Sequence, residues 1–130
     1  MPTDIQNKAD IQVLVDRFYE KIRLNEVLGP IFIDLAKVNW ETHLPKMYNF
    51  WNMVLFEELG YEGHPLRPHL AINAQQPLSP MHFDTWLNLF DETVDEIFEG
   101  EKATEIKLRA KNVAMSWAYK IDYMNKLAAN

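Results

Sequence analysis

The sequence predicts an all-α fold in a single domain spanning residues 1–130. Apolar residues recur at helical spacing in four long stretches, and no stretch alternates apolar and polar residues as a half-buried strand does. With 48% hydrophobic and 25% charged residues, the composition is that of one globular domain with one core. The chain also contains four Trp, five Tyr and seven Phe. These aromatic residues either fill the core or line a pocket for a flat ligand.

The first helix is expected at about residues 10–25. Asp10 stands where its side chain can cap the first turn. The apolar residues of this helix fall on one face, namely Ile11, Leu14, Val15, Phe18 and Ile22. Tyr19 lies at the edge of that face, so its hydroxyl points either to solvent or into a cavity that the helix covers. Gly29-Pro30 ends the pattern, and a short helical turn follows with Leu28, Ile31, Phe32 and Leu35.

A second helical pattern runs from about Asn39 to about Leu59, with apolar residues at Trp40, Leu44, Met47, Trp51, Val54 and Leu55. His43 lies on the same face, four residues before Met47 and eight before Trp51. Pro45 removes one backbone hydrogen bond from a helix interior, so the helix either bends there or begins near it.

The third long helix has the clearest start signal, because Ser79 is a good cap and Pro80 suits the first helical position. Leu78 and Phe83 are placed to pack across this cap. The apolar stripe continues to Gly100 through Phe83, Trp86, Leu87, Phe90, Val94 and Ile97. The last helix is expected at about 101–127, with a buried face of Ile106, Ala110, Val113, Ala114, Trp117, Ile121 and Met124.

Charge and composition exclude several classes of partner. The net charge is −6, and no stripe of Lys and Arg is present to bind nucleic acid or an anionic membrane. The absence of Cys excludes disulfides, thiolate metal sites and cysteine nucleophiles. The N-terminal residues lack the pattern of a signal peptide, and no apolar run is long enough to span a membrane. These features are typical of a soluble cytoplasmic protein.

The stretch His64-Pro65-Leu66-Arg67-Pro68-His69-Leu70 stands between two helical patterns. Proline fixes its own backbone and restricts the residue before it, so this connector is expected to be rigid. A rigidly held imidazole beside apolar helices is what an axial haem ligand requires. A surface histidine in a turn, or a zinc site formed by His64, His69 and His82, are the alternatives. The sequence contains no Gly-rich phosphate loop and no motif of a known hydrolase or metalloprotease.

Taken together, several motifs resemble the group III truncated haemoglobins. They are Phe18-Tyr19-Glu20-Lys21, Leu28-Gly29-Pro30-Ile31-Phe32, Trp40-x-x-His43, Phe50-Trp51, Pro65-Leu66-x-x-His69-Leu70 and Phe83-x-x-Trp86-Leu87-x-Leu89-Phe90. The resemblance runs in order from about residue 5 to residue 117. It implies a globin-like sandwich of two helices over two, with a b-type haem held between the second-pattern helix and the Ser79 helix.

The resemblance also implies roles for individual residues. His69 matches the ligand to the haem iron on the proximal side. Tyr19, His43 and Trp86 match the polar residues on the distal side. The remaining cofactor-binding residues are apolar and line the haem, namely Phe18, Phe32, Met47 and Trp51.

The implied function is the binding of oxygen and related diatomic gases at a five-coordinate haem. A phenol and an indole N–H are hydrogen-bond donors, so such a distal side also suits chemistry with nitric oxide or peroxide. An enzyme of this kind acts as a nitric oxide dioxygenase or as a peroxidase, and its electrons come from a separate reductase. The competing hypothesis is a helical interaction module without haem, in which the aromatic residues only fill the core.

Overall fold

A computed structural model describes residues 2–31, 39–57, 73 and 78–129. The long helices within these ranges are α1 (Lys8–Leu24), α2 (Trp40–Phe56), α4 (Pro80–Ile97) and α5 (Glu101–Ala129). The described residues contain no strand, only an isolated bridge between Thr3 and Phe98. The predicted all-α fold is therefore confirmed. None of the helices in these ranges is long and apolar enough to cross a membrane.

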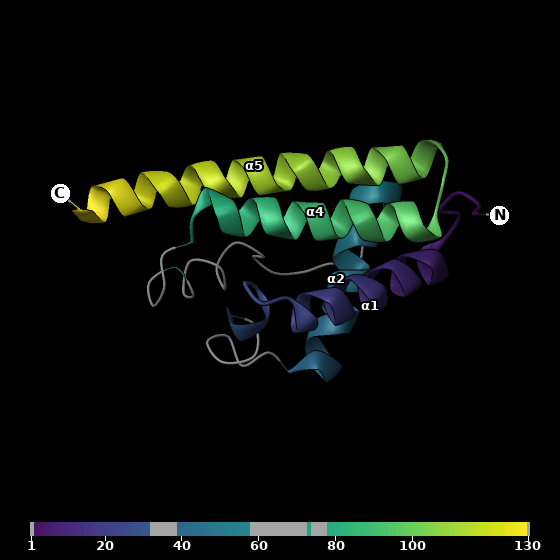
Figure 1. Cartoon of the computed structure of the whole chain (residues 1–130). Coiled ribbons are helices and arrows are strands. Elements are labelled where there is room, and N and C mark those ends of the chain that lie inside the picture. The colour runs from purple at the N-terminus through teal and green to yellow at the C-terminus, as the bar shows by residue number, and fades with distance from the viewer. Residues whose placement is uncertain (1, 32–38, 58–72, 74–77, 130) are drawn as a thin grey trace.

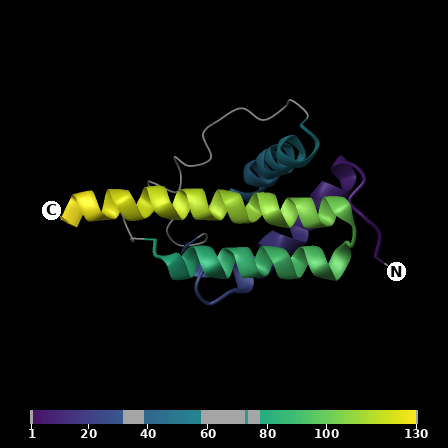
Figure 2. The same cartoon turned by 90° about the horizontal axis from the view of Figure 1, so that it is seen from above.

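The helices form two packed pairs. Helices α4 and α5 lie side by side and run in opposite directions (Figures 1 and 2). Helix α1 packs against α2 and α4, and α2 packs against α5. This is the predicted arrangement of two helices over two. The last turns of α5 extend past the start of α4, and Met124 is 45% exposed there, so the prediction that Met124 is buried is wrong.

Helix α1 begins two residues earlier than predicted, and its cap is Asn7, not Asp10. The Asn7 side chain accepts a hydrogen bond from the Asp10 backbone N–H at 3.1 Å. The Asp10 carboxylate in turn accepts from the Gln6 backbone N–H at 2.8 Å. The Asn7 side chain thus satisfies one backbone donor of the first turn, and Asp10 holds the segment that leads into the helix. The predicted apolar face of α1 is fully buried.

Helix α2 begins at Trp40 and continues through Pro45, so it does not begin at the proline. Asn39 provides the cap, because its side chain accepts from the Glu41 backbone N–H at 3.1 Å. The helix ends at Phe56, three residues before the predicted end. Glu57 adopts a left-handed conformation with φ of 58°, and its backbone N–H donates to the Met53 carbonyl.

Helix α4 starts as predicted, with Ser79 before the helix and Pro80 in its first position. The Nδ1 atom of His82 accepts a hydrogen bond from the Ser79 backbone N–H at 2.9 Å. A Glu or Gln side chain commonly has this role at a helix start. His82 is therefore part of the helix cap, which is a structural role.

The first turn of α5 is capped by a residue from the other end of the sequence. The Asp4 carboxylate accepts hydrogen bonds from the backbone N–H groups of Lys102 and Ala103, both at 2.9 Å. Gly100 has a φ of 146°, and a Cβ atom there would lie 2.5 Å from Cγ of Asp4. Only glycine fits this position, because it tolerates the conformation and leaves room for the carboxylate.

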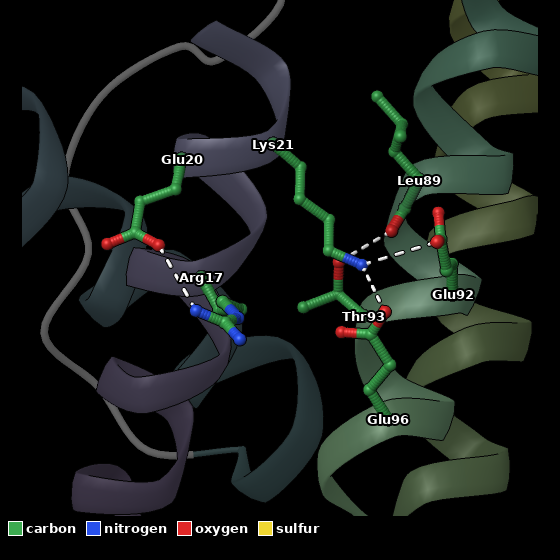
Figure 3. Close-up of polar contacts among 7 residues, drawn as sticks. All are labelled: Arg17, Glu20, Lys21, Leu89, Glu92, Thr93 and Glu96. Atoms are coloured by element: carbon green, nitrogen blue, oxygen red, sulfur yellow. Dashed lines mark hydrogen bonds and ion pairs between the residues drawn. The ribbon is translucent and has the colours of Figure 1, made fainter. Parts of the chain in front are cut away.

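Charged side chains connect α1 with α4. The Lys21 ammonium lies between two carboxylates of α4, at 2.7 Å from Glu96 and 3.5 Å from Glu92 (Figure 3). Beside it, the Thr93 hydroxyl donates to the Leu89 carbonyl at 2.6 Å. This hydroxyl is thus satisfied within its own helix, and Thr93 is fully buried.

Two further sets of side-chain hydrogen bonds join α1 to α2 and the start of α4 to α5. Between α1 and α2, the Tyr48 hydroxyl donates to the Asp16 carboxylate. Partial burial and this hydrogen bond raise the pKa of Tyr48 to about 12. Near the end of α5, Asn125 exchanges side-chain hydrogen bonds with Asn73 at 2.7 and 3.2 Å. The Asn73 oxygen also accepts from the Leu78 backbone N–H at 2.8 Å, which ties the entry of α4 to the far end of α5.

Candidate functional site

Seven ring-bearing side chains from three helices meet in the interior, and we call them the aromatic cluster. Helix α1 contributes two neighbouring residues, α2 contributes three and α4 contributes two. The members are Phe18, Tyr19, Trp40, His43, Trp51, Trp86 and Phe90. On α2 and α4 the helical spacing explains the meeting, because residues three, four or eight apart lie on one face of a helix, whereas the two α1 residues are adjacent.

One part of the aromatic cluster consists of stacked and edge-to-face rings, and Trp86 is the ring at which it meets the other members. The rings of Trp86 and Phe90 are stacked at 5.6 Å, with an interplanar angle of 16°. Trp51 stacks on Trp86 at 6.2 Å and 24°. Phe18 meets both α4 rings edge to face, at 5.4 Å from Trp86 and 5.1 Å from Phe90. These offset and edge-on arrangements are the favoured ones for aromatic rings, so they stabilise the packing of α1, α2 and α4.

The other part of the aromatic cluster carries polar atoms. Tyr19 is only 5% exposed, and its ring lies 5.2 Å from Phe18 and 5.2 Å from His43. Burial raises the pKa of the Tyr19 phenol well above its usual range. A phenol is protonated at neutral pH even at its usual pKa of about 10, and burial adds to this, so the hydroxyl is a hydrogen-bond donor.

The predicted distal residues occupy this cluster as a group. Tyr19 and His43 are in direct ring contact, at an interplanar angle of 86°. Trp86 contacts Phe18, which contacts Tyr19. The structure therefore brings a phenol, an imidazole and an indole together from α1, α2 and α4.

The predicted apolar lining is only partly within the described ranges. Phe18 and Trp51 are buried members of the aromatic cluster. Met47 is half-buried on α2 and packs against the core, one turn after His43. Phe32 and the predicted iron ligand His69 lie outside the described residues.

Two members of the aromatic cluster were not predicted as site residues. Trp40 precedes His43 by three residues, and Phe90 follows Trp86 by four. Both spacings place the residue on the same helix face as a predicted site residue, so the signal was available. A fixed spacing shows which face a residue occupies but not which ring it touches. The described residues contain no group of three His, Asp or Glu that would hold a metal ion by itself.

Comparison with known proteins agrees with this architecture. A family model described as bacterial-like globin matches residues 4–119. The group 3 truncated hemoglobin ctb of Campylobacter jejuni is 36% identical over 111 residues, which cover 83% of this chain and 85% of that protein. The crystal structure of group III truncated hemoglobin from Campylobacter jejuni superposes with a TM-score of 0.82 and 32% identity, covering 93% of this chain and 95% of the other.

The family match covers most of the chain, and the relative exceeds 30% identity over more than two thirds of it. The chain therefore belongs to the bacterial-like globins and, within them, to the group III truncated haemoglobins.

Proposed function

We propose that this chain binds a b-type haem against the aromatic cluster and holds a diatomic gas such as oxygen on the side where Tyr19 lies. The observation that supports this most is the position of the Tyr19 phenol, which is buried among flat aromatic rings and beside an imidazole. A phenol in this position can donate a hydrogen bond to a ligand held beside it.

The aromatic rings among the described residues fit a haem. Stacked apolar rings match the flat faces of a porphyrin, and Phe18, Trp51 and Trp86 supply them. His69 would hold the iron, and Phe32 and Met47 would complete the apolar lining. When bound, the haem would supply an iron atom that can bind oxygen, nitric oxide or carbon monoxide.

The chain's own residues then determine how long a gas is retained. Tyr19 and Trp86 each present an N–H or O–H donor, and donors stabilise a ligand that carries partial negative charge. His43 stands in the first turns of α2, beside Tyr19, where its ring controls entry. A polar environment of this kind suits retention of oxygen and reaction with nitric oxide or peroxide better than oxygen delivery. Continued turnover of such a reaction needs electrons from a separate reductase.

An absorption spectrum tests the proposal. Protein purified with haem, or reconstituted with it, should show a Soret band, and His69→Gly should lose the haem or recover it only with added imidazole. The matched control is His82→Gln, since His82 caps α4 and should not bind the iron. A chain that stays colourless after haem addition would support a helical interaction module instead. An unchanged ferrous spectrum in His69→Gly would assign the iron to another residue.

A further inference from the structure

Trp40 contacts both polar residues on the α1 and α2 side of the aromatic cluster. Its ring lies 5.5 Å from Tyr19 and 5.8 Å from His43, while Tyr19 and His43 are 5.2 Å apart. The three rings thus form a closed triangle. The imidazole is nearly perpendicular to both other rings, at 86° to Tyr19 and 83° to Trp40. Its orientation is therefore defined by two neighbours.

Trp40 is itself held by a cation from another helix. The Arg23 guanidinium lies over the Trp40 ring, 5.0 Å from its centroid. This is the geometry of a cation–π contact. Arg23 belongs to the last turn of α1, whereas Trp40 is the first residue of α2. The contact therefore joins the end of one helix to the beginning of the next.

The backbone fixes both partners of that contact. A Cβ atom on Gly29 would lie 2.7 Å from the Arg23 carbonyl oxygen. The chain therefore passes so close to the Arg23 backbone that this position requires glycine. On α2, the His43 backbone N–H donates to the Asn39 carbonyl at 2.8 Å, which sets the first turn that carries Trp40 and His43. The side chains of Arg23 and Trp40 are thus presented from well-defined backbone positions.

We propose that Trp40, held by Arg23, is a positioning residue that keeps the His43 imidazole against Tyr19. A histidine side chain has several staggered orientations, and its neighbours decide which one is populated. With the Trp40 ring present, the orientation toward Tyr19 has two ring contacts, one with Tyr19 and one with Trp40. Without it, orientations that swing away from Tyr19 become populated and open the route for gas entry. This inference rests on the proposed haem function, because it assigns the control of entry at that same site.

The test compares variants in the haem-loaded protein. Trp40→Leu should raise the carbon monoxide association rate about two- to tenfold, the range expected when one or two aromatic contacts are lost. Trp40→Phe keeps a ring and should restore most of the parent rate. Arg23→Gln should give a smaller increase than Trp40→Leu. The matched control is Arg17→Gln, because Arg17 is an exposed arginine of α1 that pairs with Glu20. This variant should leave the carbon monoxide association rate unchanged.

Two readouts separate positioning from a general loss of structure. The infrared C–O stretch of bound carbon monoxide should broaden or split in Trp40→Leu, because His43 then occupies more than one orientation. Nuclear Overhauser effects between the His43 and Tyr19 rings should weaken in the same variant. In a His43→Ala background, Trp40→Leu should add nothing to the rate, since Trp40 acts through the histidine.

Several results would overturn the inference. An additive effect of the two substitutions would show that Trp40 acts independently of His43. A single sharp C–O band with an unchanged rate in Trp40→Leu, in protein that carries a normal Soret band, would remove the positioning role and leave the haem function intact. A parent protein without a Soret band would contradict both the haem function and the positioning role of Trp40. If Trp40→Leu fails to fold, a rate in Arg23→Gln equal to that of Arg17→Gln would also overturn it.

Discussion

At the scale of single residues, the protonated state of Tyr19 is the property with the clearest functional consequence. Its buried phenol remains a donor across the neutral range. A hydrogen bond to a charged acceptor is worth about 1.5–3 kcal/mol, so Tyr19→Phe should raise the oxygen dissociation rate roughly ten- to a hundredfold. Trp86→Phe removes the indole donor and should act in the same direction. Stopped-flow dissociation of oxygen measures both.

Carbon monoxide provides the control for this prediction. It carries less negative charge than oxygen when bound, so its dissociation should change much less in both variants. The two substitutions should also be non-additive when combined, because Tyr19 and Trp86 would share one acceptor. An equal response of both gases would mean that the effect is steric and would contradict a polar distal role.

The sequence predicted the residues of the aromatic cluster better than it predicted their surroundings. Tyr19 lay at the edge of a helix face, and helical periodicity alone left both solvent and interior open to it. The structure places it inside because α2 supplies Trp40 and His43 as neighbours. Such a pairing between helices depends on packing between distant parts of the chain, which a periodic pattern within one helix does not contain.

At the scale of helices, Lys21 is expected to contribute to the packing of α1 on α4. Its side chain is 20% exposed and faces two carboxylates, whereas the Arg17–Glu20 pair is 58% and 54% exposed (Figure 3). Lys21→Met should lower the free energy of unfolding by about 1 kcal/mol, near the upper limit for such ion pairs. Part of the loss comes from repulsion between Glu92 and Glu96 once the cation is gone.

Urea unfolding at low and high salt measures this contribution. The effect of Lys21→Met should shrink as salt screens the charges. Arg17→Met is the matched control and should leave the stability within error, because its pair is exposed and lies within one helix. If both variants lose the same amount, the connection between α1 and α4 does not depend on Lys21.

The helices themselves were largely predictable, and their ends less so. Periodicity located the buried face of α1, and the Ser79-Pro80 cap signal located the start of α4, since both signals are local. The cap of α1 was assigned to Asp10 instead of Asn7, because both residues have suitable side chains within one turn. Met124 continues the apolar pattern of α5 but is exposed, because the helix runs past its neighbour. An apolar pattern within one helix does not show where the neighbouring helix ends.

At the scale of the whole molecule, Asp4 makes stability depend on pH. Although burial opposes ionisation, the N–H groups of Lys102, Ala103 and Ile5 and the Lys102 charge hold the pKa of Asp4 below its usual value. A carboxyl with a lowered folded-state pKa stabilises the fold above its unfolded value of about 3.9, and this stabilisation is lost as pH falls through the folded value.

Asp4→Asn should therefore destabilise the protein at pH 7 by about 0.5–1.5 kcal/mol, because the amide has one acceptor oxygen for the two N–H groups of α5 and carries no charge. The difference between the parent and Asp4→Asn should narrow as pH falls from about 4 through the lowered pKa of the folded state, because the parent carboxyl becomes protonated over that range. Urea unfolding at a series of pH values measures the difference. A difference that does not change between pH 7 and pH 3 would show that the charge of Asp4 has no role. Asp122→Asn, on the exposed part of α5, is the control.

The contact between Asp4 and the first turn of α5 is also the one that sequence reasoning had no means of finding. The partners are separated by 98 residues along the chain, and neither belongs to a motif that specifies the other. Gly100 by itself did not indicate this contact, because a glycine at the end of a helix pattern ordinarily marks only the end of the helix. The specific reason for this glycine becomes visible once the Asp4 carboxylate is seen beside it.

The same contact sets an order of events during synthesis. At about 5–20 residues per second, Lys102 is added roughly 5–20 s after Asp4. Throughout that interval the segment before α1 has no α5 end to cap, although α1 and α2 are both complete about halfway through it. The chain therefore caps the start of α5 with a residue made 98 positions earlier, and a ribosome-bound fragment that stops at α4 lacks the partner that holds the segment before α1 in place.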